Sequence, residues 1–242
     1  MHQSAIHLEK FYATPLGLAA RDMTLRRLST LWSDLANKEV LVFGYGHPYI
    51  QPYLHQTKRL IQAMPSAQGA IAYQSKRGIM TCLVDEQYLP FDDAQFDHVL
   101  VAHGLEESEA LQPLLAELWR VTRPEGRVVI IAPNRGGLWA SSDKSPFGSG
   151  RPFTRFQLKH LLTQVGYEPV FWSGALYAPP IKFCVKPGPL EAFERFGETV
   201  WPRFSGLVLV EAIKRLYANP DGLKSHRITR PAMGGPIPLG SG

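Results

Sequence analysis

Short apolar runs alternate with stretches of helical spacing along most of this chain. The runs VLVFG, FDHVLVA and RVVIIA are rich in β-branched residues and end at glycine or polar residues, which is typical of buried parallel strands. Weaker runs of the same kind predict further strands. The seven predicted strands are 40–44, 69–73, 79–84, 96–102, 127–132, 168–173 and 207–210.

Helical spacing of apolar residues predicts the elements between these strands. Thr154 and Gln157 form a capping box that opens one of the helices, and Gly166 closes it. The predicted helices are 24–35, 49–64, 111–119, 154–165 and 190–196. Strands that alternate with helices predict parallel βαβ units. We therefore expect one α/β domain over 1–218, with a doubly wound, mostly parallel seven-stranded sheet and helices on both faces.

Composition and charge narrow the class of protein. The 242 residues are 45% apolar and 19% charged, an ordinary globular balance. No apolar stretch is long enough to span a bilayer, and residues 1–10 lack the pattern of a signal peptide, so we expect a cytoplasmic location. Cys82 and Cys184 are expected to be buried free thiols, and no Cys/His cluster has the spacing of metal ligands.

The net charge of +5 comes mainly from the end of the chain. From Lys214 onward five basic residues and one acid give +4, which leaves +1 for residues 1–213. We therefore expect no nucleic-acid partner, because the body has no basic face. Residues 219–242 are rich in Pro and Gly and lack periodicity, so we expect an irregular basic tail.

Candidate ligand-binding residues follow the predicted strands. In an open α/β sheet, ligands bind outside the carboxyl ends of the strands. Gly44-Tyr45-Gly46 follows the first strand, Asp85 the third and His103 the fourth. Glycines in the first position let the backbone approach a ligand closely, although tight strand-to-helix turns also use them.

The order of these elements resembles a known family. VLVFGYG … LVDEQYLPFDDAQFDHVLVAHGLEE … LAELWRVTRPEGRVVIIAPN, within 38–134, is similar to the class I S-adenosylmethionine (SAM)-dependent methyltransferases, in the branch with D-x-x-x-L-P-F … F-D-x-V. The resemblance implies a Rossmann-like methyltransferase fold with SAM as the cofactor. It places Gly44, Tyr45 and Gly46 in the loop under the methionine part of the cofactor. It also implies that Asp85 accepts a hydrogen bond from the adenine amino group and that Glu86 lies near the ring.

The sequence departs from the family pattern at two places. The third glycine of the loop is replaced near Pro48. In the family pattern an acidic residue at the end of the second strand accepts hydrogen bonds from both ribose hydroxyls. That residue is missing here, and Gln74 stands in its expected place. A neutral amide oxygen is a weaker acceptor than a carboxylate, so we expect cofactor affinity to fall by about 1–2 kcal/mol.

The remaining site candidates lie after the fourth and fifth strands. The resemblance places His103 beside the transferred methyl group, where it is either a catalytic base, a cofactor contact or a hydrogen-bonded structural residue. The long loop 134–153 is either a lid on the substrate or partner side or a solvated connection, and as a lid it would place Arg135, Trp139 and Arg151 on the substrate side. The aromatic insertion 175–205 is a lid, a partner surface or packing across the sheet edge.

Two functions from different classes fit these features. The first is SAM-dependent methyl transfer to a small-molecule acceptor. The second is a methyltransferase-fold subunit with weak or no catalysis, which binds a protein partner through 175–205 and the basic tail. A nicotinamide-dependent dehydrogenase fits less well, because neither G-x-G-x-x-G nor an acid after the second strand is complete.

Overall fold

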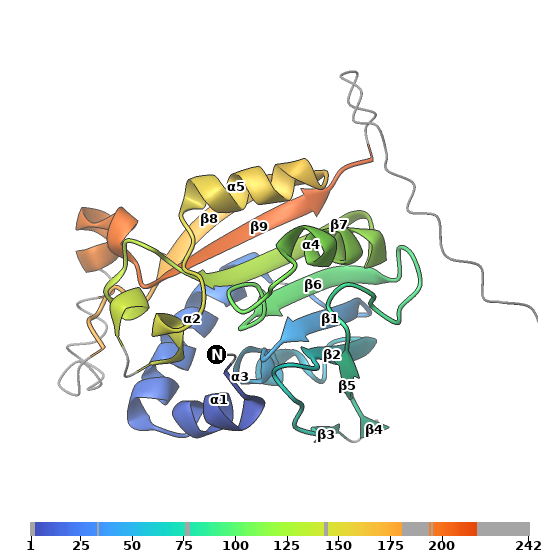
Figure 1. The fold of residues 1–242 in the computed structure, drawn as a ribbon, viewed down its shortest axis with the longest axis horizontal. Coiled ribbons are helices and arrows are strands. Elements are labelled where there is room, and N and C mark those ends of the chain that lie inside the picture. The colour runs from blue at the N-terminus through green and yellow to red at the C-terminus, as the bar shows by residue number, and fades with distance from the viewer. Residues whose placement is uncertain are drawn as a thin grey trace, which may run out of the picture.

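The computed structural model describes residues 3–32, 34–75, 78–142, 145–180, 194 and 196–216. In these residues a central sheet of seven strands has the order β5-β2-β1-β6-β7-β9-β8, with helices on both faces (Figure 1). The strands are β1 Glu39–Gly44, β2 Arg59–Pro65, β5 Thr81–Val84, β6 Phe96–Ala102, β7 Thr122–Pro133, β8 Tyr167–Ala175 and β9 Leu207–Lys214. The helices are α1 Ala5–Tyr12, α2 Pro15–Leu31, α3 His47–Ile50, α4 Leu111–Val121 and α5 Arg155–Gln164.

The direction of the strands confirms the predicted fold class. β5, β2, β1, β6 and β7 pair in parallel, whereas β9 runs antiparallel to both of its neighbours, β7 and β8. From β1 the chain first builds the sheet on one side, through β2 and β5, and then crosses to the other side of β1, where β6 lies. This reversal makes the topological switch point at which ligands of such sheets bind.

Two apolar clusters fill the space on either side of the sheet. Val40 and Val42 of β1 pack with α1 and α2, whereas Leu41 and Phe43 pack with α4 and α5. Strands that are buried on both faces read as continuous apolar runs, which is why β1 was recognisable in the sequence. Helix α1 had not been predicted, and α2 begins at Pro15 rather than at Thr24.

The predicted helix 49–64 is wrong. The helical turns after β1 end at Tyr53, at the end of the short 3-10 helix η1 Gln51–Tyr53, and Leu60, Ile61 and Met64 belong to β2. Their spacing fits either element, and pairing of β2 with β1 and β5 decides it. The predicted strand 69–73 is accordingly absent, and that part of the chain leads into a separate two-stranded ribbon, β3 Gln74–Ser75 and β4 Gly78–Ile79.

His98 makes the stability of this fold depend on pH. It lies in β6 against the edge of Trp32, and its buried Nδ1 has no hydrogen-bond partner in the part of the chain that the structure describes. Burial lowers the pKa of His98 to about 4. In the unfolded chain, His98 takes up a proton near pH 6.5, whereas in the folded chain it stays neutral down to about pH 4. The contribution of neutral His98 to the free energy of unfolding is therefore complete above pH 6.5 and is lost as the pH falls toward 4.

We therefore expect the free energy of unfolding to fall by about 2 kcal/mol through His98 between pH 7 and pH 4.5. Urea denaturation of the wild type and of His98→Leu at both pH values measures this effect. The variant should lose less stability on acidification than the wild type. Equal losses in the two proteins would contradict this account of His98.

Candidate functional site

A cavity of about 360 Å³ lies at the carboxyl ends of β2, β5 and β6. Its size falls within the range of about 300–1,000 Å³ that is usual for small-molecule sites. Pro65 and Val84, which end β2 and β5, are paired neighbours in the sheet. The cavity is lined by residues 65–68, 84–87, Gly104, Glu107 and Glu109.

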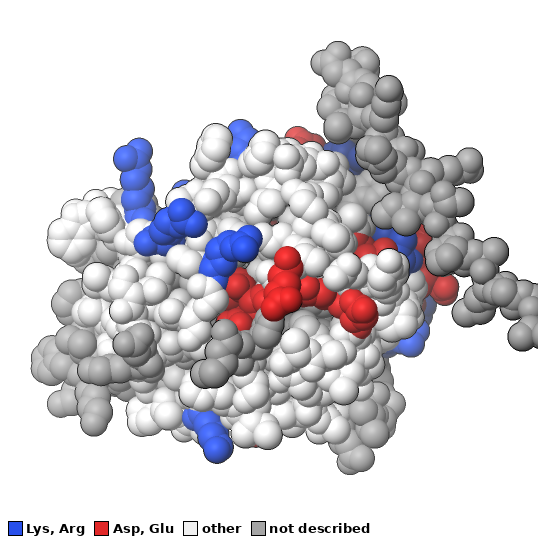
Figure 2. All heavy atoms as spheres, in the orientation of Figure 1, with Lys and Arg blue, Asp and Glu red and all other residues white. Residues whose placement is uncertain are grey.

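Carboxylates give the cavity an anionic wall. The predicted residues Asp85 and Glu86 both line it. Asp85 Oδ1 accepts a hydrogen bond from the backbone N–H of Gln87 at 2.9 Å, and Glu86 Oε1 accepts one from Ala110 at 3.2 Å. Figure 2 shows acidic side chains gathered near the centre of this face of the molecule. Such a wall favours a ligand that carries positive charge and hydrogen-bond donors.

Gln68 adds a buried acceptor that the sequence had not indicated. It lines the cavity at 4% exposure, and its Nε2 donates a hydrogen bond of 2.6 Å to the carbonyl of His103. Its Oε1 is buried and has no hydrogen-bond partner among the described residues. Buried polar atoms are rarely left unpaired, so this oxygen is a candidate contact for a ligand donor.

Residues 66–68, not 72–75, follow the second strand of the sheet. The placement of Gln74 at the end of that strand is therefore wrong, because the second strand ends at Pro65 and Gln74 belongs to the ribbon strand β3. The absence of an acid at the strand end remains, since Ser66, Ala67 and Gln68 stand there. Gln68 was missed because β2 was taken for a helix.

The glycines after β1 are required by packing within the protein. Gly44 has φ +81°, and a Cβ there would lie 2.4 Å from the carbonyl oxygen of Ala102 in β6. A Cβ on Gly46 would lie 2.3 Å from Val42 Cγ1. Neither glycine is among the residues that line the cavity, so their contact with a cofactor stays a prediction.

Aromatic rings surround Tyr45, the residue between these glycines. Tyr45 is buried, stacks on Tyr12 with ring centroids 6.1 Å apart, and its hydroxyl lies 3.1 Å from that of Tyr73. The ring of His47 stacks on that of Tyr73. Burial lowers the pKa of His47 to about 4. His47 is therefore neutral at physiological pH.

The loop 134–153 lies over the same end of the sheet as Asp85. The backbone N–H of Arg151 donates to the carbonyl of Glu106, immediately before the cavity residue Glu107. Trp139 is buried and donates from Nε1 to the carbonyl of Ala178, which ties this loop to the segment after β8.

The three predicted substrate-side residues do not converge on the cavity. Trp139 serves packing, whereas the side chains of Arg135 and Arg151 are exposed and are not among the lining residues. Arg135 donates to the carbonyl of Pro152. The tail 219–242 and part of the insertion 175–205, including Phe193, lie outside the described residues.

The sequence and the fold are both similar to those of known methyltransferases. Residues 42–130 match the model of a methyltransferase domain. Over these residues the chain is similar to that domain. The ubiquinone/menaquinone biosynthesis C-methyltransferase UbiE of Ralstonia nicotianae is 37% identical over 65 residues, which are 27% of this chain and 26% of the relative. UbiE of Burkholderia cenocepacia is 44% identical over 57 residues, 23% of this chain and 24% of the relative. The chain thus spans about a quarter of the length of these curated relatives.

Solved structures extend the likeness to most of the chain. A SAM-dependent methyltransferase of Thermotoga maritima, described as a possible histamine N-methyltransferase, has a TM-score of 0.60 at 17% identity and covers 86% of this chain and 94% of its own. Geranyl diphosphate C-methyltransferase from Streptomyces coelicolor has a TM-score of 0.54 at 15% identity, covering 79% of this chain and 76% of its own. At these identities the likeness shows the fold.

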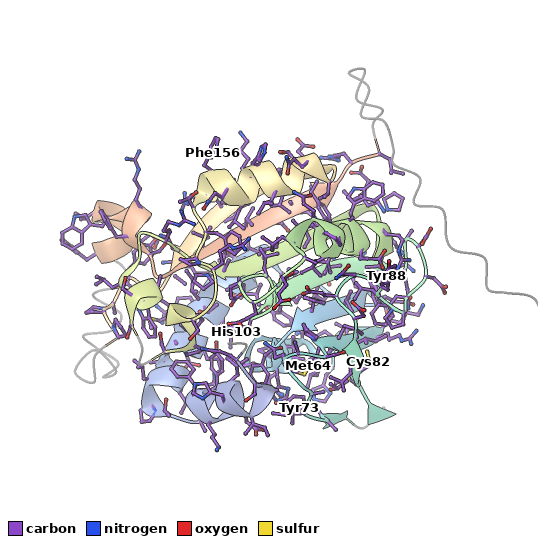
Figure 3. All side chains as sticks on the ribbon, in the orientation of Figure 1. Met64, Tyr73, Cys82, Tyr88, His103 and Phe156 are labelled. Carbon is purple, nitrogen blue, oxygen red and sulfur yellow. The ribbon has the colours of Figure 1, made fainter. Side chains whose placement is uncertain are left out.

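His103, which is labelled in Figure 3 and lies within residues 42–130, belongs to a buried chain of hydrogen bonds. Its Nε2 lies 2.7 Å from the hydroxyl of Tyr12, which lies 2.6 Å from that of Tyr49. Its Nδ1 lies 3.4 Å from Glu106 Oε1, and Glu106 Oε2 is buried without a partner. Burial raises the pKa of Tyr12 well above its usual value, so Tyr12 remains a phenol.

The partners of the two ring nitrogens allow His103 to act as a hydrogen-bond acceptor at Nε2. With the proton on Nδ1 facing Glu106, Nε2 accepts the hydrogen bond from Tyr12. A carboxylate on one side and an acceptor nitrogen on the other are the parts of a general base. His103 also has φ +50°, a backbone strain that requires support from its surroundings, and the Phe147 ring stacks against it at 5.1 Å. Tyr12 and Glu106 could not be found from the sequence, since no motif marks them.

In the described part of the chain, no group of His, Cys, Asp and Glu could hold a metal ion. Cys82 is a half-buried free thiol. Among the helices that the structure describes, none is both long and apolar enough to cross a membrane.

Proposed function

We propose that this domain binds SAM in the cavity beside β2, β5 and β6 and transfers its methyl group to a small-molecule acceptor. The observation that carries the proposal is the position of the cavity: it lies at the carboxyl ends of the strands next to the switch point, with Asp85 in its wall. Residues 42–130, which match the methyltransferase domain, contain Asp85, Gln68 and His103.

The donors of SAM fit the acceptors of the cavity. SAM presents an adenine amino group, two ribose hydroxyls and a positive charge. Asp85 offers a carboxylate for the amino group, and Gln68 Oε1 is a buried acceptor without a partner in the described structure. Glu107 and Glu109 line the same cavity and favour a cationic ligand.

The protein's contribution to the reaction is positioning and proton handling. Transfer of a methyl group from a sulfonium needs alignment of the acceptor above all. His103 and Tyr12 are not among the residues that line the cavity. Where the acceptor must also lose a proton, His103 is the proposed base, because its Nε2 lies 2.7 Å from the hydroxyl of Tyr12 and Glu106 would stabilise the imidazolium. Because the curated relatives are named for quinone biosynthesis, quinone precursors are the first acceptors to test.

The test is release of S-adenosylhomocysteine from SAM in the presence of a panel of phenols, hydroquinones and amines. We expect release that depends on one acceptor class and a loss of kcat/KM of about tenfold or more in Asp85→Ala. Asp22→Ala is the matched control, since Asp22 is exposed on α2 and pairs with Arg21. SAM binding without any acceptor-dependent release would contradict the enzyme proposal and support a partner-binding subunit.

A further inference from the structure

Large apolar side chains stand exposed at one end of the molecule, beyond the cavity of the proposed active site. Leu138, Phe196, Trp201 and Phe204, here called the aromatic patch, are 60%, 53%, 55% and 60% exposed. They border an apolar hollow of about 450 Å³, which Tyr177, Pro179 and Gly197 also line. Contiguous exposed apolar surface of this kind marks an interaction site.

Ordered backbone holds the aromatic patch in place. The buried carboxylate of Glu194 accepts hydrogen bonds from the N–H groups of Tyr177 and Ala178 at 2.6 and 3.0 Å. The Trp201 ring meets Phe196 edge to face with centroids 5.5 Å apart. The short 3-10 helix η5 Pro202–Phe204 follows directly and carries Phe204. These contacts support part of the aromatic patch, whose rings stand exposed although burial would favour them inside the core.

Arginines surround the aromatic patch. Arg203 lies within η5, between Trp201 and Phe204. Arg135 precedes Gly136, where a Cβ would lie 3.5 Å from the carbonyl oxygen of Arg203. Arg155 begins α5, and burial raises the pKa of Tyr177 in the wall of the hollow, an effect that the charge of Arg155 partly offsets. These three exposed residues are called the arginine collar.

Among the described residues at this end, the unpaired charges are positive. Of the acidic residues near the hollow, Glu198 pairs bidentately with Arg27, and Glu194 is buried on backbone N–H groups. Figure 2 shows basic side chains toward the left of the view, near the end that carries η5, whereas acidic ones gather near the centre. The surface thus combines exposed aromatic rings with cations and is separate from the acidic cavity.

We propose that the aromatic patch and the arginine collar bind the surface of an anionic lipid bilayer. Trp and Phe rings sit favourably at the boundary between headgroups and acyl chains, and guanidinium groups bind lipid phosphates. The open apolar hollow suits inserted acyl chains, and the collar selects an anionic surface. The inference rests on this surface alone and does not require methyl transfer.

The test is co-sedimentation of the full chain with vesicles of phosphatidylcholine, with and without phosphatidylglycerol. We expect binding to the anionic vesicles that weakens as salt is added. The double variant Trp201→Ser, Phe204→Ser and the charge reversal Arg203→Glu should each weaken this binding by about tenfold or more. Circular dichroism confirms that the variants fold.

Tyr88→Ser is the matched control. Tyr88 is 73% exposed and lies at the end of the molecule opposite η5 (Figures 1 and 3), so its loss should leave vesicle binding unchanged. No binding to anionic vesicles would overturn the proposal, as would binding that the patch and collar variants do not change. A wild-type dimer in size exclusion that Trp201→Ser, Phe204→Ser dissociates would assign the patch to a second copy of the chain instead. The assay contains no SAM, so its failure leaves the methyltransferase proposal untouched.

Discussion

Replacing Gly44 with alanine is expected to lower the free energy of unfolding by about 3 kcal/mol or more. Two causes act together at this position. The backbone has φ +81°, which L side chains rarely adopt, and the new Cβ would lie 2.4 Å from the carbonyl oxygen of Ala102 and 2.9 Å from the amide nitrogen of Gly104. Both of these neighbours are backbone atoms, so β1 and β6 would have to separate.

Gly69→Ala is the matched control for this prediction. Gly69 has a similar φ of +75°, but a Cβ there would meet nothing within 4 Å. It should therefore cost only the conformational strain, about 1 kcal/mol. Urea denaturation of both variants measures the difference, which isolates the close approach of β1 and β6. Equal losses in the two variants would show that Gly44 is merely a turn residue.

Asp85→Asn is expected to weaken binding of S-adenosylhomocysteine by about tenfold or more, through loss of a charged acceptor. The amide keeps an oxygen for the N–H of Gln87, so the local turn should survive. Calorimetric titration measures the dissociation constant. An unchanged constant would mean that Asp85 does not face the ligand.

The same titration shows whether a carboxylate at position 66 or at position 74 strengthens binding of S-adenosylhomocysteine. Ser66 stands directly after β2, so Ser66→Asp should supply the missing carboxylate and tighten binding several-fold. Gln74→Glu, in the ribbon, should have no effect. Tighter binding in the Gln74 variant alone would reverse this assignment.

Elements whose sequence pattern fits one structure only were predictable. β1, β6 and the second half of β7 are short β-branched runs buried on both faces, and α4 has a single apolar stripe. The capping box of Thr154 and Gln157 is present as predicted. The segment 59–65 failed because its apolar residues suit helix and strand equally, and contacts distant in sequence decide between them.

The candidate site was predictable only where it follows from strand ends. Asp85 and His103 come directly after correctly placed strands, and the structure puts Asp85 in the wall of the cavity and His103 beside the switch point. Tyr12, Gln68 and Glu106 join them through packing of an unpredicted helix and through side-chain hydrogen bonds. No local spacing encodes such contacts, because they depend on where the sheet brings the chain together.

A crystal structure of the full chain with S-adenosylhomocysteine tests the central claim most directly. The account predicts the adenine beside Asp85 and the ribose toward Ser66 and Gln68, within the cavity at the ends of β2, β5 and β6. A ligand bound elsewhere, or an empty cavity at millimolar S-adenosylhomocysteine, would contradict it.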